Sequence, residues 1–214
     1  MTAAPAERTR RRGNRVVRLA RHALELEFAI WASLGRLVAR RPRVPAGAER
    51  FGYHRPVLTI VIVFIVLSAA EIPILDLIVH RWEAVRIGVL VLGIWGLTWM
   101  VGLLAAYLVR PHSVGPTGIL VQNGLDPEIA LPWNDIASVE HDRRIDEPKS
   151  PKIVEDAGRR TLVLRMQEES NIVVELERPT AVRRPGGERE VVDAVRFHVD
   201  DAAGFMAAVR RHIP

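Results

Sequence analysis

Two apolar stretches decide the fold: residues 57–79 read VLTIVIVFIVLSAAEIPILDLIV, and residues 87–109 read IGVLVLGIWGLTWMVGLLAAYLV. Each stretch has 23 residues, and a helix of that length rises about 34 Å. The hydrocarbon core of a bilayer is roughly 30 Å thick, so both stretches are predicted to be transmembrane helices. The alternative is a pair of core helices in a soluble protein, but the rest of the chain has too little apolar surface to enclose them.

The two helices are predicted to form an antiparallel hairpin, because only residues 80–86 separate them as a short external loop. Six arginines lie in residues 36–56, directly before the first stretch, whereas the loop holds two. Positive residues beside a membrane helix favour the cytoplasmic side. We therefore expect a multi-pass protein of the cell (inner or plasma) membrane with both termini in the cytoplasm. Trp82 suits the outer interfacial belt.

Charge is segregated along the 214 residues. Residues 1–55 carry 13 arginines and 4 acids, residues 56–110 carry 3 of each, and residues 111–214 carry 14 basic and 18 acidic groups. The net charge of +5 therefore comes from the N-terminal quarter, which argues against a uniformly basic nucleic-acid-binding protein. The absence of cysteine excludes disulfides, cysteine-based metal sites and a thiol nucleophile.

Residues 14–42 are predicted to form an amphipathic helix on the inner leaflet, after a disordered basic tail at 1–13 and before a linker at 43–56. Apolar residues recur along this segment at close to helical spacing, and prolines follow its end. The candidate lipid-surface residues are Arg15, Arg18, Trp31, Arg36, Arg40 and Arg41. Packing on the C-terminal domain and pairing with a second copy are the alternatives. Nucleic acid is disfavoured as a partner because the helix is so apolar.

The first apolar stretch contains candidate intramembrane polar residues: Glu71 and Asp76, followed by His80. A charged group deep in a bilayer is costly when it faces lipid, so Glu71 is expected to face the partner helix or to be protonated. Asp76 and His80 are four residues apart and could pair. One interpretation is a titratable cluster of a membrane sensor or of a transporter's accessory subunit. The favoured interpretation is structural, with Glu71 bonded to Thr98, Trp95 or Trp99.

Residues 110–214 are predicted to form one small domain of short strands closed by a helix. The strand-like runs lie at 119–122, 137–141, 161–166, 172–177 and 191–199. Residues 142–160 and 183–187 are expected to be exposed loops. Asn123-Gly124 is a strong turn signal. Asp201 can cap a final helix whose apolar side chains would cover an open end of the sheet.

Two motifs in this domain carry a resemblance: VGPTGILVQNG at 114–124 and LPWNDIASV at 131–139. They resemble the opening hairpin and the following turn of bacterial pleckstrin-homology-like (PH-like) domains, and the whole plan resembles small two-span membrane proteins of actinobacteria. The resemblance implies an α+β, mostly antiparallel barrel or sandwich closed by one C-terminal helix. It implies core and turn roles for Gly118, Asn123, Gly124, Pro132, Trp133 and Ile136. It implies no activity.

The loop at 123–128 departs from the eukaryotic lipid-binding pattern, because it holds two acids and no base. A protein partner or self-association is therefore expected, in addition to the lipid bilayer. No phosphate-binding loop, dinucleotide-binding glycine motif or hydrolase motif occurs, and the histidines lack metal-ligand spacing. No catalytic, cofactor or metal site is predicted. We expect a non-enzymatic scaffold or assembly factor.

Overall fold

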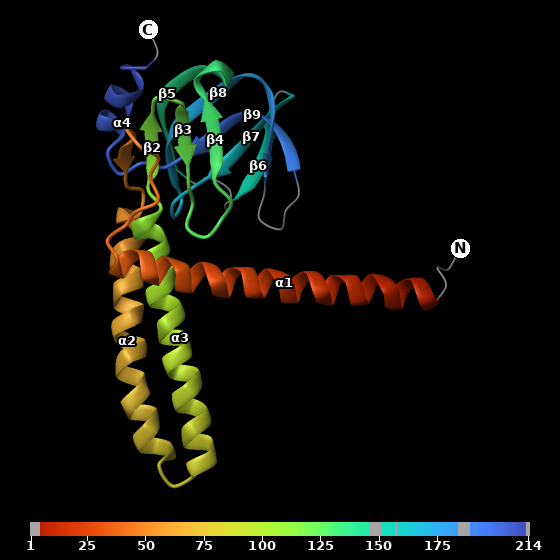
Figure 1. Ribbon diagram of the computed structural model, residues 1–214, viewed down its shortest axis with the longest axis vertical. Helices are drawn as coiled ribbons and strands as arrows, with labels where there is room; N and C mark the ends of the chain where they lie inside the picture. Colours follow the sequence, from red (N-terminus) through yellow and green to blue (C-terminus); the bar gives the residue numbers. More distant parts are fainter. Residues whose placement is uncertain (1–4, 146–150, 157, 184–188, 213–214) are drawn as a thin grey trace.

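The computed structural model describes residues 5–145, 151–156, 158–183 and 189–212, and the side chains from residue 20 onward except that of His22. Two long antiparallel helices form a hairpin, a third helix crosses it, and a domain of two sheets sits at one end (Figure 1).

The hairpin consists of α2 (Arg55–Val79) and α3 (Glu83–Val109). Both helices are long and apolar enough to cross a membrane, and 0% and 6% of their most apolar windows are buried. They are therefore not core helices of the domain, and the prediction of two long apolar helices is confirmed. The connection is shorter than the predicted loop at 80–86 and spans residues 80–82, because α3 begins at Glu83, before the apolar stretch.

The helix α1 runs from Pro5 to Val38. The prediction of a disordered tail is therefore wrong from residue 5 onward, and residues 1–4 lie outside the described residues. Proline is favoured in the first turn of a helix, and the alanine, glutamate and arginine that follow are good helix formers. The helix ends close to Arg40, which has a φ of +51° and so interrupts the helical backbone.

The hairpin is an insertion in a sheet. Strand β1 (Glu49–Phe51) precedes α2, strand β2 (His112–Gly115) follows α3, and the two strands pair antiparallel. The expected linker at 43–56 is therefore partly a strand of the domain. Three residues are too short to show a strand period, so the pairing has no strong local signal.

Strands β3 (Gly118–Val121) and β4 (Ile129–Pro132) complete the four-stranded sheet in the order β1-β2-β3-β4. Gly118 has a φ of +145°, and a Cβ there would lie 2.1 Å from the carbonyl oxygen of Leu131. The Asn123-Gly124 turn is confirmed, with Gly124 at a φ of +53° and Asp126 N–H donating to the Asn123 carbonyl at 2.9 Å.

The second sheet has five strands in the order β5-β8-β9-β7-β6. Their bounds are β5 Ile136–Ile145, β6 Lys152–Asp156, β7 Arg159–Leu164, β8 Glu169–Arg183 and β9 Arg189–Phe197. The expected loop at 142–160 is wrong, because it contains β6 and the ends of two other strands. The many charged side chains in this segment favour a loop prediction. They are compatible with a strand here because β6 is an edge strand with an exposed side. The loop expected at 183–187 lies outside the described residues apart from Arg183.

Both sheets and the final helix α4 (Ala202–Val209) share one core. Phe205 of α4 packs edge-on against Phe51 and Phe197, from the two different sheets. The predicted cap is confirmed, because the Asp201 carboxylate accepts the Gly204 N–H at 2.9 Å. Ile136 is buried in this core and Trp133 packs against it, while its Nε1 donates to the Gly115 carbonyl at 3.0 Å.

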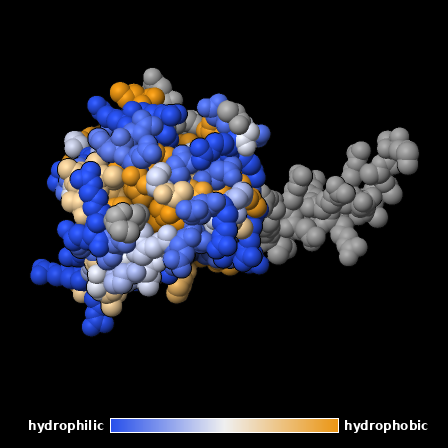
Figure 2. Space-filling view, turned by 90° about the horizontal axis from the view of Figure 1, so that it is seen from above, coloured by the Kyte–Doolittle hydropathy of each residue, from blue (hydrophilic) through white to orange (hydrophobic). Residues whose placement is uncertain are grey.

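Of the two expected architectures, barrel and sandwich, the closed barrel is not formed, since no strand of one sheet pairs with a strand of the other within the described residues. Strand β9 lies between β7 and β8, and it pairs parallel with β7 and antiparallel with β8. Trp133 belongs to the short helix η1 (Trp133–Asp135), which separates the two sheets along the chain. Seen from above, the domain surface is mostly hydrophilic with smaller hydrophobic areas (Figure 2).

Candidate functional site

Near the loop end of the hairpin, no described hydrogen bond or ion pair joins Glu71, Asp76 and His80 to one another. The Asp76 carboxylate accepts hydrogen bonds from Arg86 Nε at 2.5 Å and Nη2 at 3.0 Å. His80 Nδ1 lies 2.6 Å from the Leu77 carbonyl oxygen. Glu71 is exposed. The predicted Asp76–His80 pairing is thus replaced by an ion pair that joins the two helices.

The helix α1 packs crosswise on α3 where Ile30 meets Gly102 (Figure 1). Ile30 is fully buried, and a Cβ on Gly102 would lie 2.4 Å from Ile30 Cγ2. Ser33, one helical turn further, is also buried, and its hydroxyl donates to the Ala29 carbonyl at 2.7 Å. Only glycine at residue 102 permits this approach of the two helices.

Beside this crossing, three indoles donate to the carboxylate of Glu27. Trp31 and Trp95 Nε1 donate to Oε1 at 3.2 Å each, and Trp99 Nε1 donates to Oε2 at 2.6 Å. The bond from Trp95, followed by those from Trp99 and Trp31, holds the pKa of Glu27 below its usual value despite partial desolvation. We call Glu27, Trp31, Trp95 and Trp99 the indole cluster.

The indole cluster corrects the structural prediction for Glu71. Trp95 and Trp99 bind Glu27, while Thr98 donates to the carbonyl of Ile94 in its own helix at 2.8 Å. The sequence signal was available, because Glu27 and Trp31 are four residues apart on one helix face. Trp95, however, lies 68 residues after Glu27 in the chain. No local sequence pattern predicts a contact over that separation.

An exposed apolar stripe runs along α1 through Leu24, Phe28, Trp31 and Val38, which are 70%, 76%, 54% and 84% exposed. Successive helix residues turn by about 100°, so the stripe lies on the side of α1 that Glu27 and Trp31 share. Glu27 reaches Trp95, which lies closer to the loop end of α3 than Gly102 does. The stripe therefore lies on the side of α1 that is turned toward the loop end of the hairpin.

The candidate lipid-surface arginines with described side chains do not share the face of this stripe. Arg36 is half-buried, while Arg40 and Arg41 are exposed. Arg36 lies about 140° around the helix from Trp31, on a different face. The side chains of Arg15 and Arg18 lie outside the described residues.

Hydrogen bonds fix the hairpin to the domain directly after β1 and at the start of α2. The Asp200 N–H donates to the Gly52 carbonyl at 2.8 Å, and the Asp200 carboxylate accepts the Arg55 N–H at 3.1 Å. Gln167 Nε2 donates to the Pro56 carbonyl at 2.6 Å. These bonds connect the second sheet's loops with the first turn of α2.

A buried aromatic group holds the same junction from the inside. Tyr53 is 1% exposed, its hydroxyl accepts the Gly124 N–H at 2.7 Å, and its ring stacks on His112 at 4.4 Å between centroids. His112 Nδ1 accepts the Gln122 N–H and Nε2 donates to the His198 carbonyl, each at 3.0 Å. Burial lowers the pKa of His112 to about 3, so this histidine is neutral and structural.

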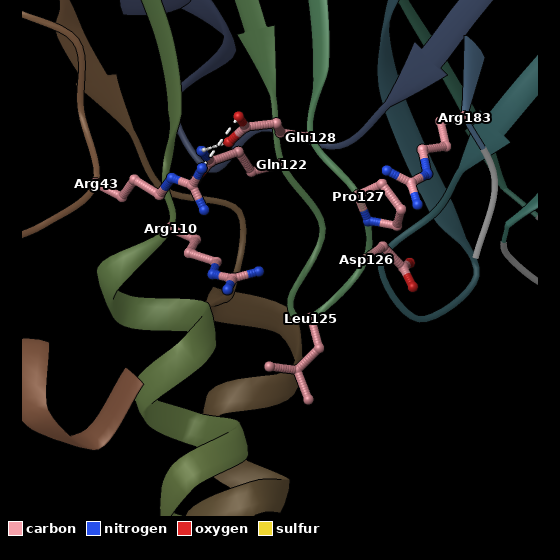
Figure 3. Close-up of a pocket in the computed structure, with 8 residues that line it drawn as sticks. All are labelled: Arg43, Arg110, Gln122, Leu125, Asp126, Pro127, Glu128 and Arg183. Carbon is pink, nitrogen blue, oxygen red and sulfur yellow. Dashed lines mark hydrogen bonds and ion pairs between the residues drawn. The ribbon is translucent and has the colours of Figure 1, made fainter. Parts of the chain in front are cut away.

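A pocket of about 360 Å³ opens between the end of α3 and the β3–β4 loop (Figure 3). We call it the arginine pocket, and its lining residues are Arg43, Arg110, Gln122, Leu125, Asp126, Pro127, Glu128 and Arg183. Arg43 and Arg110 lie on one side, and Arg183 lies on the other beside Pro127 and Asp126 (Figure 3). The three cations come from the segment before β1, the end of α3 and the end of β8.

Arg110 is the central cation of the arginine pocket. Its Nη1 donates to the Gly124 carbonyl at 3.3 Å, and its Nε is buried without a hydrogen-bond partner among the described residues. Burial and then the neighbouring charges of Arg43 and Arg36 lower its pKa. An unsatisfied buried donor is unfavourable, so an acceptor at this position would stabilise the pocket.

The acids of the pocket already have partners. Glu128 pairs with Arg43 Nη2 at 3.2 Å, and Asp126 accepts a bond from Asn123 Nδ2 at 2.8 Å. In the sequence, the loop at 123–128 has two acids and no base. The pocket has no sequence signal, because its bases are distant in sequence and only the fold brings them to this loop.

The comparisons with known proteins bring no relative. No protein-family model matches the chain, and neither a curated protein nor a solved structure shows significant similarity to it. Within the described residues, no group of three or more histidine, aspartate or glutamate side chains could hold a metal ion.

Proposed function

We propose that this protein is a non-enzymatic integral membrane scaffold, which holds its C-terminal domain in a fixed orientation at the cytoplasmic face and presents it to a protein partner. The observation that carries the proposal is the β1–β2 pair, which encloses the hairpin between neighbouring strands of one sheet. A tethered domain would need a flexible linker, whereas here strands flank the hairpin at both ends.

The orientation relative to the bilayer rests on α1. With the hairpin across the membrane, the apolar stripe of α1 would lie in the boundary of the inner leaflet, and the indole cluster would hold α1 against α3. Tryptophan favours this interfacial level. The six arginines in residues 36–55 support a cytoplasmic location for α1 and the domain.

A protein is the preferred partner of the domain surface as a whole. Residues 111–214 carry 14 basic against 18 acidic groups, so broad attraction to nucleic acid is unfavourable. We retain a PH-like domain as the finer fold proposal: two sheets with a C-terminal helix over the shared core support it. The two separate sheets depart from a closed barrel, and the parallel β7–β9 pair departs from a wholly antiparallel domain.

Site-specific crosslinking in native membranes tests the scaffold. The natural chain has no cysteine, so Ile145→Cys on the exposed end of β5 and Trp82→Cys in the hairpin turn each carry a single photoreactive label. We expect one discrete protein adduct from the residue 145 label and none from the residue 82 label.

The same adduct should weaken when the domain loses its fixed orientation. Asp200→Ala removes the carboxylate that accepts the Arg55 N–H, and Glu140→Ala is the matched control on an exposed part of β5. A lower yield of the discrete adduct in Asp200→Ala than in Glu140→Ala, at equal protein abundance, would support the proposal. Absence of an adduct at residue 145 and at further labelled positions over the domain would contradict a protein scaffold.

A further inference from the structure

We propose that the arginine pocket binds a phosphate group. The pocket has a volume of about 360 Å³ and draws three guanidinium groups from separate parts of the chain. Arginine suits phosphate because its planar group presents several N–H donors in a fixed fork.

Arg110 has a buried N–H donor that is not satisfied within the described residues. A guanidinium has five N–H donors, yet the single bond of Arg110 within the described residues is to the Gly124 carbonyl, and its buried Nε has no acceptor. Phosphate oxygens would supply acceptors where the protein supplies none.

Positive charge surrounds the space beside Arg110 on two sides. Arg43 and Arg110 line one side of the pocket (Figure 3), and burial followed by the charges of Arg43 and Arg36 lowers the pKa of Arg110. Arg183 lines the opposite side (Figure 3). Glu128 neutralises Arg43 through their 3.2 Å contact and thereby competes with an incoming anion. The pocket thus has an internal acid whose removal should strengthen anion binding.

The position of the pocket leaves two sources for the phosphate. Arg110 lies eight residues beyond Gly102, about 12 Å further along α3 on the domain side of the α1 crossing. With α1 at the bilayer boundary, this height is level with, or just beyond, the headgroups. The phosphate could belong to an anionic phospholipid or to a soluble phosphate compound, and the chemistry recognised is the same.

Two measurements on the full-length protein separate these sources. Calorimetric titration with inorganic phosphate, on protein in phosphatidylcholine nanodiscs at constant ionic strength, measures soluble binding. Native mass spectrometry after release from nanodiscs of mixed phosphatidylcholine and phosphatidylglycerol counts retained anionic lipid. Saturable phosphate binding assigns a soluble ligand, and selective retention of phosphatidylglycerol assigns a lipid headgroup. If neither measurement detects binding, the proposal is overturned.

Charge variants link the signal to the pocket. Arg110→Gln and Arg183→Gln should each weaken binding about tenfold, and Glu128→Gln should tighten it about threefold. Arg178→Gln is the matched control, because Arg178 pairs with Asp135 outside the pocket. Arg183 is exposed, so its variant tests the pocket even if Arg110→Gln impairs folding. Equal affinity of Arg183→Gln, Glu128→Gln and the wild type would overturn the assignment.

Discussion

At the scale of single residues, His112 shows how the junction between hairpin and domain uses polar groups without exposing them. The imidazole is 2% exposed, both ring nitrogens are hydrogen-bonded, and its ring lies between Tyr53 and Phe197. Protonation would place a charge where neither water nor a carboxylate bonded to the ring compensates it. The pKa of about 3 follows from this burial.

His112 predicts a loss of stability in weak acid. Its pKa is about 3 in the folded protein against 6.5 for the free side chain, so unfolding takes up a proton between these values. The contribution of His112 to the free energy of unfolding is fully present above pH 6.5, and it falls by up to about 1.4 kcal/mol per pH unit below that pH. Thermal unfolding in nanodiscs at pH 7 and pH 5 measures this change.

The matched variant is His112→Gln, which keeps a polar side chain but does not titrate. It should be less stable than the wild type at pH 7 and should lose less stability on going to pH 5. An equal drop in midpoint temperature for both proteins would assign the acid sensitivity to other groups. The range stops at pH 5 because most carboxylates titrate below it.

At the scale of elements, α1 was predictable as an amphipathic helix but its packing was not. Periodicity indicated the apolar residues, and the structure divides them between two faces: Ile30 packs on α3, whereas Leu24 and Phe28 are exposed. Sequence periodicity cannot make that division, because both faces are apolar. The close approach at Gly102 also has no local signature, since glycine is frequent in membrane helices.

The indole cluster predicts that Glu27 holds α1 on α3. Glu27→Ala removes the acceptor of three indole N–H groups, so amide hydrogen exchange in residues 24–34 should accelerate about fivefold in nanodiscs. Glu25→Ala is the control, because Glu25 pairs only with the exposed Arg21 of the same helix among the described contacts. Equal exchange in both variants would show that Ile30 packing alone holds the helix.

At the scale of the whole molecule, hydrophobicity predicted the hairpin and turn chemistry predicted the Asn123-Gly124 turn and the Asp201 cap. The insertion of the hairpin into a sheet was not predictable, because β1 has three residues and its partner lies beyond two long helices. The arginine pocket was missed for the same reason. Its parts become neighbours only when β1, α3 and β8 are assembled.

A distance measurement between two spin labels tests directly whether the domain has one orientation relative to the hairpin. Spin labels on Leu92→Cys in α3 and Ala137→Cys in β5 occupy exposed positions of a chain without natural cysteine. Pulsed electron paramagnetic resonance on the full-length protein in nanodiscs measures their separation. We predict a single narrow distance distribution, which broadens in Asp200→Ala. A broad distribution in the protein with Asp200 intact would contradict a fixed orientation.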